Sequence, residues 1–107
     1  MIERPYTFNQ SETKLIERLV NDQNVNINHI ILPKGECVPE HYSNSHVHLI
    51  IVQGTMDLQL DDQPKTQYRK GHIIGVPFQT KMNICNTQEA LLEFFVIKAP
   101  HPRAMKK

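Results

Sequence analysis

Short apolar stretches, each ended by turn-forming residues, recur along most of the chain. In residues 25–32 (VNINHIIL) the side chains alternate, so that Asn26 and Asn28 lie on the face opposite to the apolar residues. Residues 47–53 (VHLIIVQ) are apolar on both faces, and residues 56–60 alternate until the turn-like sequence DDQP. Further short strands are predicted at residues 66–69, 73–76, 81–85 and 91–98.

No segment has the length and periodicity of a long helix. Residues 14–20 (KLIERLV) fit either a short helix or a strand. Eight or more short strands, with turns about every 8 to 12 residues, are typical of an all-β sandwich or barrel. At 107 residues the chain predicts one domain. We divide it into an N-terminal segment (1–24) that contributes to the barrel or to a dimer, the barrel (25–98) and a tail (99–107).

The glycine and histidine residues in the first half of the chain have a recognisable spacing. Five residues separate Gly35 from His41, and Gly54 closes the strand that follows. This resembles the first motif of the cupin family, whose spacing is Gly, five residues, His, one, His, three, Glu, six, Gly. Both glycines and the first histidine are in register. The resemblance implies a small jelly-roll β-barrel.

A second group of residues, later in the chain, also has the spacing of a cupin motif. Gly71 is followed after five residues by Pro77, and Asn86 lies nine positions beyond. These residues match the second cupin motif, whose inner glycine falls here on Gln79. The resemblance spans residues 25–98. It predicts the fold but not the activity, because this fold hosts many activities.

The metal-binding positions of the family are mostly altered in this chain. The resemblance implies three histidines and a glutamate as ligands, but the four positions hold His41, Ser43, Val47 and Met82. Serine is a poor ligand, valine is none, and a thioether suits only soft ions. Catalytic metal sites use about three protein ligands. We therefore predict a degenerate metal site, no cofactor, and a pocket in which these four residues bind a small organic ligand.

His46 and His48 flank Val47. If Val47 faces the interior, strand alternation places both histidines on the outer face with Ile50 and Val52. This outer face is unusually apolar for solvent, and cupins often pair. We therefore predict a homodimer with the two histidines at the rim of its interface.

An alternative places these histidines at a metal. The turn-prone residues 43–45 could form a bulge, so that His41, His46 and His48 bind Zn, Fe, Mn or Ni. The protein would then be a metal-dependent oxygenase or isomerase. A metal-free enzyme is a third hypothesis, with His41 as general base and Ser43 or Glu93 positioning the substrate. Whether the chain is an enzyme stays open at this point.

Two further titratable residues stand in apolar strands. His29 is either a pocket acid or base or a hydrogen-bonded core or interface residue. Glu93, in the sequence LLEFF, is either a general acid with a raised pKa or part of a salt bridge. We assign no site role to His72 or His101.

Composition narrows the classes of partner. The net charge of +1 and the ordinary charged fraction of 21% predict no nucleic-acid or membrane partner. The first residues lack the apolar stretch of a secretory signal, so a cytoplasmic location is expected. In that compartment the two cysteines, Cys37 and Cys85, are predicted to be reduced, inert thiols.

Overall fold

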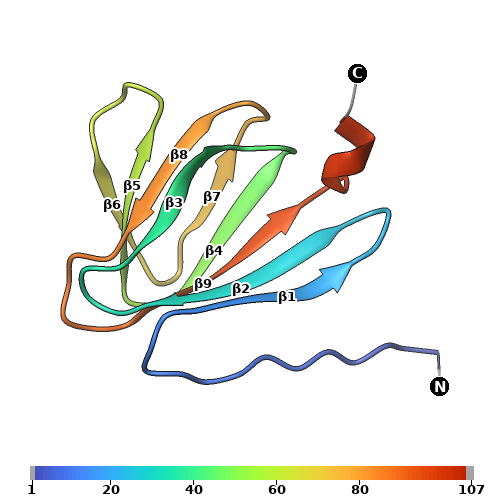
Figure 1. Ribbon diagram of the computed structural model, residues 1–107, viewed down its shortest axis with the longest axis horizontal. Coiled ribbons are helices and arrows are strands. Elements are labelled where there is room, and N and C mark those ends of the chain that lie inside the picture. Colours follow the sequence, from blue (N-terminus) through green and yellow to red (C-terminus); the bar gives the residue numbers. More distant parts are fainter. Residues whose placement is uncertain (1, 106–107) are drawn as a thin grey trace.

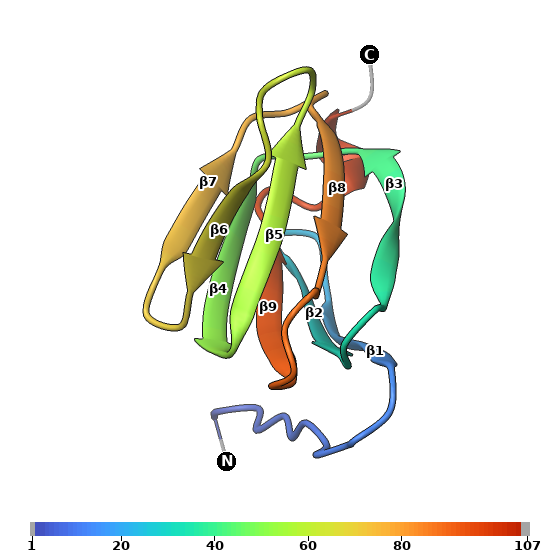
Figure 2. The same cartoon turned by 90° about the vertical axis from the view of Figure 1, so that its left-hand side faces the viewer.

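The structure, a computed structural model that describes residues 2–105, consists of two antiparallel β-sheets packed face to face (Figures 1 and 2). One sheet has the strand order β1-β2-β9-β4-β7, and the other has the order β3-β8-β5-β6. The elements are β1 (Leu15–Asn21), β2 (Asn26–Leu32), β3 (Cys37–Tyr42), β4 (Val47–Gln53), β5 (Thr55–Leu60), β6 (Thr66–Arg69), β7 (Ile73–Val76), β8 (Lys81–Cys85), β9 (Leu92–Lys98) and the short 3-10 helix η1 (Pro102–Met105). No helix within residues 2–105 has the length and hydropathy that crossing a bilayer requires.

The predicted all-β jelly roll is confirmed, but its details differ from the prediction. Of the ambiguous residues 14–20, residues 15–20 belong to β1, which pairs with β2. Residues 37–42 form a strand, β3, that the sequence pattern did not reveal. The two sheets do not close into the barrel that we predicted, since no ladder joins them in the part of the chain described here. The expected tail contains η1, and its last two residues lie outside the described residues.

The core lies between the sheets and follows the alternation of the strands. In β4, Val47, Leu49 and Ile51 are at most 1% exposed, while His48 on the opposite face is exposed. Leu32, Met56, Leu92 and Phe94 are also fully buried in this core. The assumption that Val47 faces the interior is therefore correct.

The turn positions of the two motifs have backbone angles that favour glycine. Gly35, Gly54 and Gly71 have φ values of +86°, +82° and +93°. Gln79, at the position of the family's inner glycine, has a φ of 63°, and its backbone N–H donates to the Ser43 carbonyl oxygen at 2.9 Å. Gln79 therefore adopts the left-handed conformation without being a glycine, which costs an L-residue about 1 to 2 kcal/mol.

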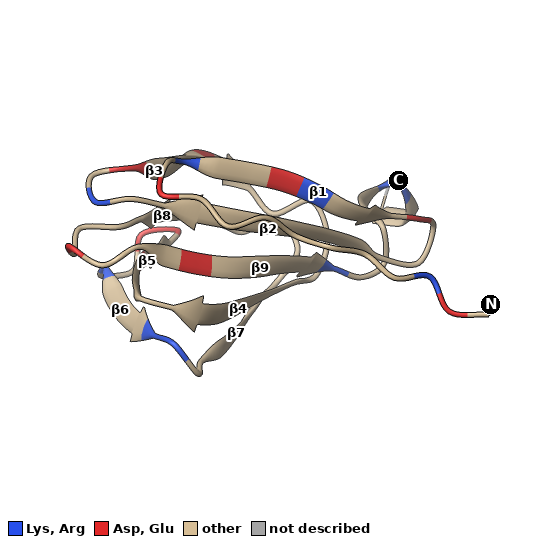
Figure 3. Cartoon of the chain, turned by 90° about the horizontal axis from the view of Figure 1, so that it is seen from below, with Lys and Arg blue, Asp and Glu red and all other residues tan. Residues whose placement is uncertain are grey.

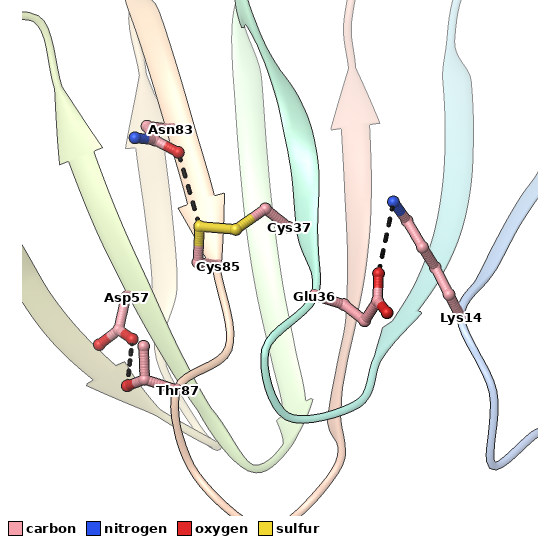
Figure 4. The surroundings of a disulfide bond; sticks show 7 residues. All are labelled: Lys14, Glu36, Cys37, Asp57, Asn83, Cys85 and Thr87. Carbon is pink, nitrogen blue, oxygen red and sulfur yellow. Dashed lines mark hydrogen bonds and ion pairs between the residues drawn. A yellow bond between two sulfur atoms is a disulfide. The ribbon is translucent and has the colours of Figure 1, made fainter.

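The two cysteines form a disulfide, which corrects the prediction of reduced thiols (Figure 4). Cys37 of β3 is the register partner of Cys85 in β8, and their Cα atoms are 4.1 Å apart. Direct cross-strand neighbours bring their sulfur atoms together. The sequence hid this proximity because the cysteines are 48 positions apart and β3 was not predicted.

Removing the disulfide should destabilise the protein. The cross-link restricts the unfolded chain, and for a separation of 48 residues the chain-entropy account gives about 4 kcal/mol. We expect the double variant Cys37→Ser/Cys85→Ser to lose up to this amount of unfolding free energy in urea titrations. Two alkylatable thiols in the oxidatively purified, denatured wild-type protein would contradict the disulfide.

Candidate functional site

An apolar cavity of about 120 Å³ lies between the two sheets. Its wall is built from both sheets and contains Ile16, Asn28, Ile30, Val38, His41, Leu49, Met82, Ile84, Val96 and Lys98. Most of these side chains are aliphatic, and the polar ones are Asn28, His41 and Lys98. The arrangement suits a small, mostly apolar molecule.

Two of the four predicted pocket residues line this cavity. His41 and Met82 are register partners in β3 and β8, so they face the space together. The Nδ1 atom of His41 lies 2.8 Å from the Pro39 carbonyl oxygen, which accepts a hydrogen bond when this nitrogen carries the proton. Nε2 of His41 is then the acceptor of the neutral ring.

The other two predicted pocket residues, Ser43 and Val47, contribute to the fold and do not line the cavity. The Ser43 hydroxyl donates to the Pro77 carbonyl oxygen at 2.5 Å and accepts from the Thr80 backbone N–H at 2.8 Å. Ser43 thereby ties the end of β3 to the loop before β8. Val47 is 1% exposed and belongs to the hydrophobic core. Neither residue is among those that line the cavity.

The residues at the family's metal positions do not fit a divalent ion. Ser43 is engaged by two backbone groups, Val47 offers no donor atom, and Met82 offers a thioether. His41 alone remains as a ligand for a borderline divalent ion. Within residues 2–105, no three His, Cys, Asp or Glu side chains lie together so that they could hold an ion.

His46 and His48, the alternative ligands, are both exposed. His48 pairs with Gly75 of β7 on the outer face of the sheet. Its ring packs over this glycine, because a Cβ atom added to Gly75 would lie 3.6 Å from His48 Nε2. The same outer face exposes Val52 (43%) and Ile73 (65%). A homodimer through this face stays a prediction.

His29 lies on the outer face of β2, in a cluster with two carboxylates. Its Nδ1 is 2.7 Å from Glu17 Oε1, and its Nε2 is 2.6 Å from Glu93 Oε2. The rings of Phe8 and Phe95 lie 4.9 Å from the imidazole, and His29 is fully buried. Of the two interpretations of His29 and Glu93, these contacts match the hydrogen-bonded core residue and the salt bridge.

The N-terminal segment covers this cluster. Figure 3 shows it crossing β2 between the acidic positions of β1 and β9. Asn9 donates to Glu17 from both its backbone N–H and its side-chain amide, at 3.2 and 2.5 Å. The segment before β1 is thus anchored by the same carboxylate that binds His29.

This geometry predicts an acid-sensitive fold. The hydrogen bonds from His29 and from the Asn9 backbone lower the pKa of Glu17 below its ordinary value of 4.5. A lowered folded-state pKa adds stability that is fully present above the unfolded value and is lost as the pH falls through the folded value. We expect Glu17→Gln to flatten the decline in unfolding free energy between about pH 5 and about pH 3. Glu40→Gln, at an exposed position, should leave the decline unchanged.

A polar hollow of about 320 Å³ adjoins the cavity, and sequence reasoning missed it. Asn28 and Lys98 line both spaces. The remaining residues of the hollow are Arg18, Asn21, Asn26, Asn44, His101, Pro102 and Arg103. One signal was available: the alternation of β2 put two asparagines on one face, and that face is the interior.

Comparisons with known proteins agree with this geometry. The chain is 54% identical over 106 residues to an uncharacterized protein of Methanocaldococcus jannaschii, covering 98% of this chain and 91% of that protein. The crystal structure of an RmlC-like cupin family protein with a double-stranded β-helix fold, from the same organism, is also 54% identical and superimposes with a TM-score of 0.95, covering 98% and 97% of the two chains. A cupin superfamily protein of Desulfitobacterium hafniense, at 20% identity, shares the fold with a TM-score of 0.74 over 87% of this chain and 83% of that one. No protein-family model matches the chain.

Proposed function

Because this chain belongs to the cupin family, we propose that it uses the cupin fold to bind a small organic molecule in the cavity between the two sheets, without a metal ion. His41 lines this cavity, and most of the other lining residues are aliphatic side chains from both sheets. The protein acts as a binding module in this proposal, located in the cytoplasm and paired with a second copy.

One observation carries the proposal. His41 and Met82 face a cavity of about 120 Å³ whose other walls are mainly aliphatic. Apolar cavities of about 150 Å³ in proteins stay dry and accept molecules of the size of benzene. A hydrocarbon group of slightly smaller size therefore fits the cavity in volume and polarity.

The test fills the cavity and asks whether binding is lost. Val38 lines the cavity from β3, an edge strand, so Val38→Phe should occupy the space without crossing the centre of the core. We expect short aliphatic alcohols to shift the methyl NMR signals of Leu49 and Ile84 in the wild type but not in this variant. Ile2→Phe, at a fully exposed position outside both sheets, is the matched control and should bind as the wild type does. Equal shifts in both variants, or no shift in any protein, would overturn the proposal.

Metal content gives a second prediction. We expect untagged protein, incubated with Fe, Mn, Ni or Zn and then dialysed, to retain far less than one ion per chain by elemental mass spectrometry. Only His41 remains as a suitable donor at the family's metal positions, and one imidazole does not retain a divalent ion. Stoichiometric metal that is lost on His41→Ala/His48→Ala substitution would instead support the enzyme hypothesis.

A further inference from the structure

Polar side chains interrupt the apolar interior at one end of the five-stranded sheet. On the inner face of this sheet, Ile16 of β1, Ile30 of β2 and Val96 of β9 line the apolar cavity. We call the end of the sheet where β2 begins and β9 ends the open end. Toward this end the same face continues with Arg18 in β1, Asn28 and Asn26 in β2, and Lys98 in β9. The register pairs Arg18 with Asn28, and Asn26 with Lys98, so these four side chains form one continuous patch.

The chain after β9 completes this patch. The Ser45 hydroxyl donates to the Pro100 carbonyl oxygen at 2.5 Å, and the Ala99 backbone N–H donates to the His46 carbonyl oxygen at 3.2 Å. These bonds hold the segment that carries His101 and Arg103 beside the open end of the cavity. His101 Nε2 lies 2.7 Å from Asn21 Oδ1, which also accepts from the Asn26 amide at 3.3 Å.

The charges of the hollow are not balanced. Arg18, Lys98 and Arg103 line it, and no Asp or Glu is among its lining residues. None of the three cations forms an ion pair within residues 2–105. Asp22 is the acidic group that acts on His101, and its carboxylate already accepts the backbone N–H groups of Asn24 and Val25.

Burial and the neighbouring positive charges act together on two titratable groups of the hollow. Burial, together with the nearby Arg18, lowers the pKa of Lys98. Burial, followed by Arg103 and Arg18, lowers the pKa of His101, against a smaller raising effect of Asp22. The hollow therefore repels further positive charge and favours an anion.

Two buried acceptors are also left without a partner. Asn26 is 7% exposed, and its Oδ1 atom has no hydrogen-bond donor among the described residues, nor has Oδ1 of Asn28. A buried, unpaired carbonyl oxygen costs about 1 to 3 kcal/mol. An anion alone cannot satisfy it, because it needs an N–H or O–H donor. A ligand amine would carry a positive charge into the cationic hollow, whereas a hydroxyl would not.

We propose, resting on the proposed function above, that the site binds a short-chain aliphatic alpha-hydroxycarboxylate. Its carboxylate binds Arg18 and Lys98, its hydroxyl donates to the free Oδ1 of Asn26 or Asn28, and its hydrocarbon chain enters the apolar cavity. The two adjoining spaces share Asn28 and Lys98, which places the polar and apolar parts of the ligand side by side. The cavity volume of about 120 Å³ suits a branched chain of a few carbons.

Four probes separate the parts of this ligand. They are alpha-hydroxyisocaproate, isocaproate without the hydroxyl, lactate without the chain, and isohexyl alcohol without the charge. By isothermal titration calorimetry we expect alpha-hydroxyisocaproate to bind about tenfold more tightly than each of the others, since a hydrogen bond or a charge contact changes affinity by about that factor. Binding of the two isocaproates should weaken with added salt, and that of the alcohol should not.

Variants then assign the contacts. Lys98→Met should weaken both isocaproates about tenfold and leave the alcohol unchanged. One of the two variants Asn26→Leu and Asn28→Leu should remove the advantage of the hydroxyl, and that variant identifies the acceptor. Arg69→Gln, in the other sheet at β6, is the control for loss of a surface charge. Equal affinity for acid and alcohol, or equal weakening of both by Lys98→Met, would overturn this inference and leave cavity binding intact. Absence of binding by every probe, the alcohol included, would overturn the proposed function as well.

Discussion

His29→Ala should lower the free energy of unfolding by about 3 to 5 kcal/mol, the loss expected when one partner of a buried ion pair is removed. His29 is fully buried, and its two ring nitrogens lie 2.7 and 2.6 Å from Glu17 and Glu93. Without the imidazole, the carboxylate of Glu93, which is 7% exposed, keeps its burial and loses its partner. The two phenylalanine rings also lose a contact.

The measurement is urea unfolding followed by circular dichroism near neutral pH. His29→Ala/Glu93→Leu is the informative companion, because it removes the orphaned carboxylate along with the imidazole. We expect the double variant to recover part of the lost stability, as replacement of a buried ionic pair by apolar residues often does. A double variant less stable than His29→Ala would show that the loss comes from packing and not from the unpaired charge.

Gly54→Ala should cost at least about 3 kcal/mol, because two penalties coincide at this position. The φ of +82° disfavours any L-residue, and an added Cβ would lie 2.2 Å from the Leu91 carbonyl oxygen. That atom belongs to the backbone immediately before β9, so it has no side-chain rotamer with which to move away. The turn between β4 and β5 would have to shift against the central strand of its sheet.

Gly35→Ala is the matched control for this prediction. Gly35 has a similar φ of +86°, but an added Cβ would have no atom within 4 Å. Its cost should be that of the backbone conformation alone, about 1 to 2 kcal/mol. Equal melting-temperature losses for the two variants in thermal scans would show that the contact with β9 relaxes without cost.

The sequence predicted most of the fold because its strands are short and clearly bounded. The bounds of β4 match residues 47–53, since an apolar run there ends at a glycine that the turn requires. β3 escaped detection because CVPEHY carries a proline and little apolar character, which is typical of an edge strand. Because β3 was not predicted, the pairing of Cys37 with Cys85 could not be predicted either.

The site was predicted less completely than the fold. The family spacing located His41 and Met82 at the cavity, because both are fixed by the β3–β8 ladder. It also selected Ser43, whose hydroxyl is taken by backbone groups that only the folded loop brings near. Lys98 and Arg18 carry no motif. Their meeting depends on the register of three strands and on which face is interior, and neither follows from the linear pattern.

The position of the disulfide has a consequence for the rate of ligand exchange. β3 forms one wall of the cavity and pairs with β8 alone, so it is the strand whose detachment would open the cavity sideways. The bond between Cys37 and Cys85 fastens the beginning of β3 to its neighbour. Under the proposed function, the disulfide would hinder this lateral route in the oxidised protein, and a ligand would exchange through the end lined by Lys98. Association and dissociation should therefore both speed up when the protein is reduced, with little change in their ratio.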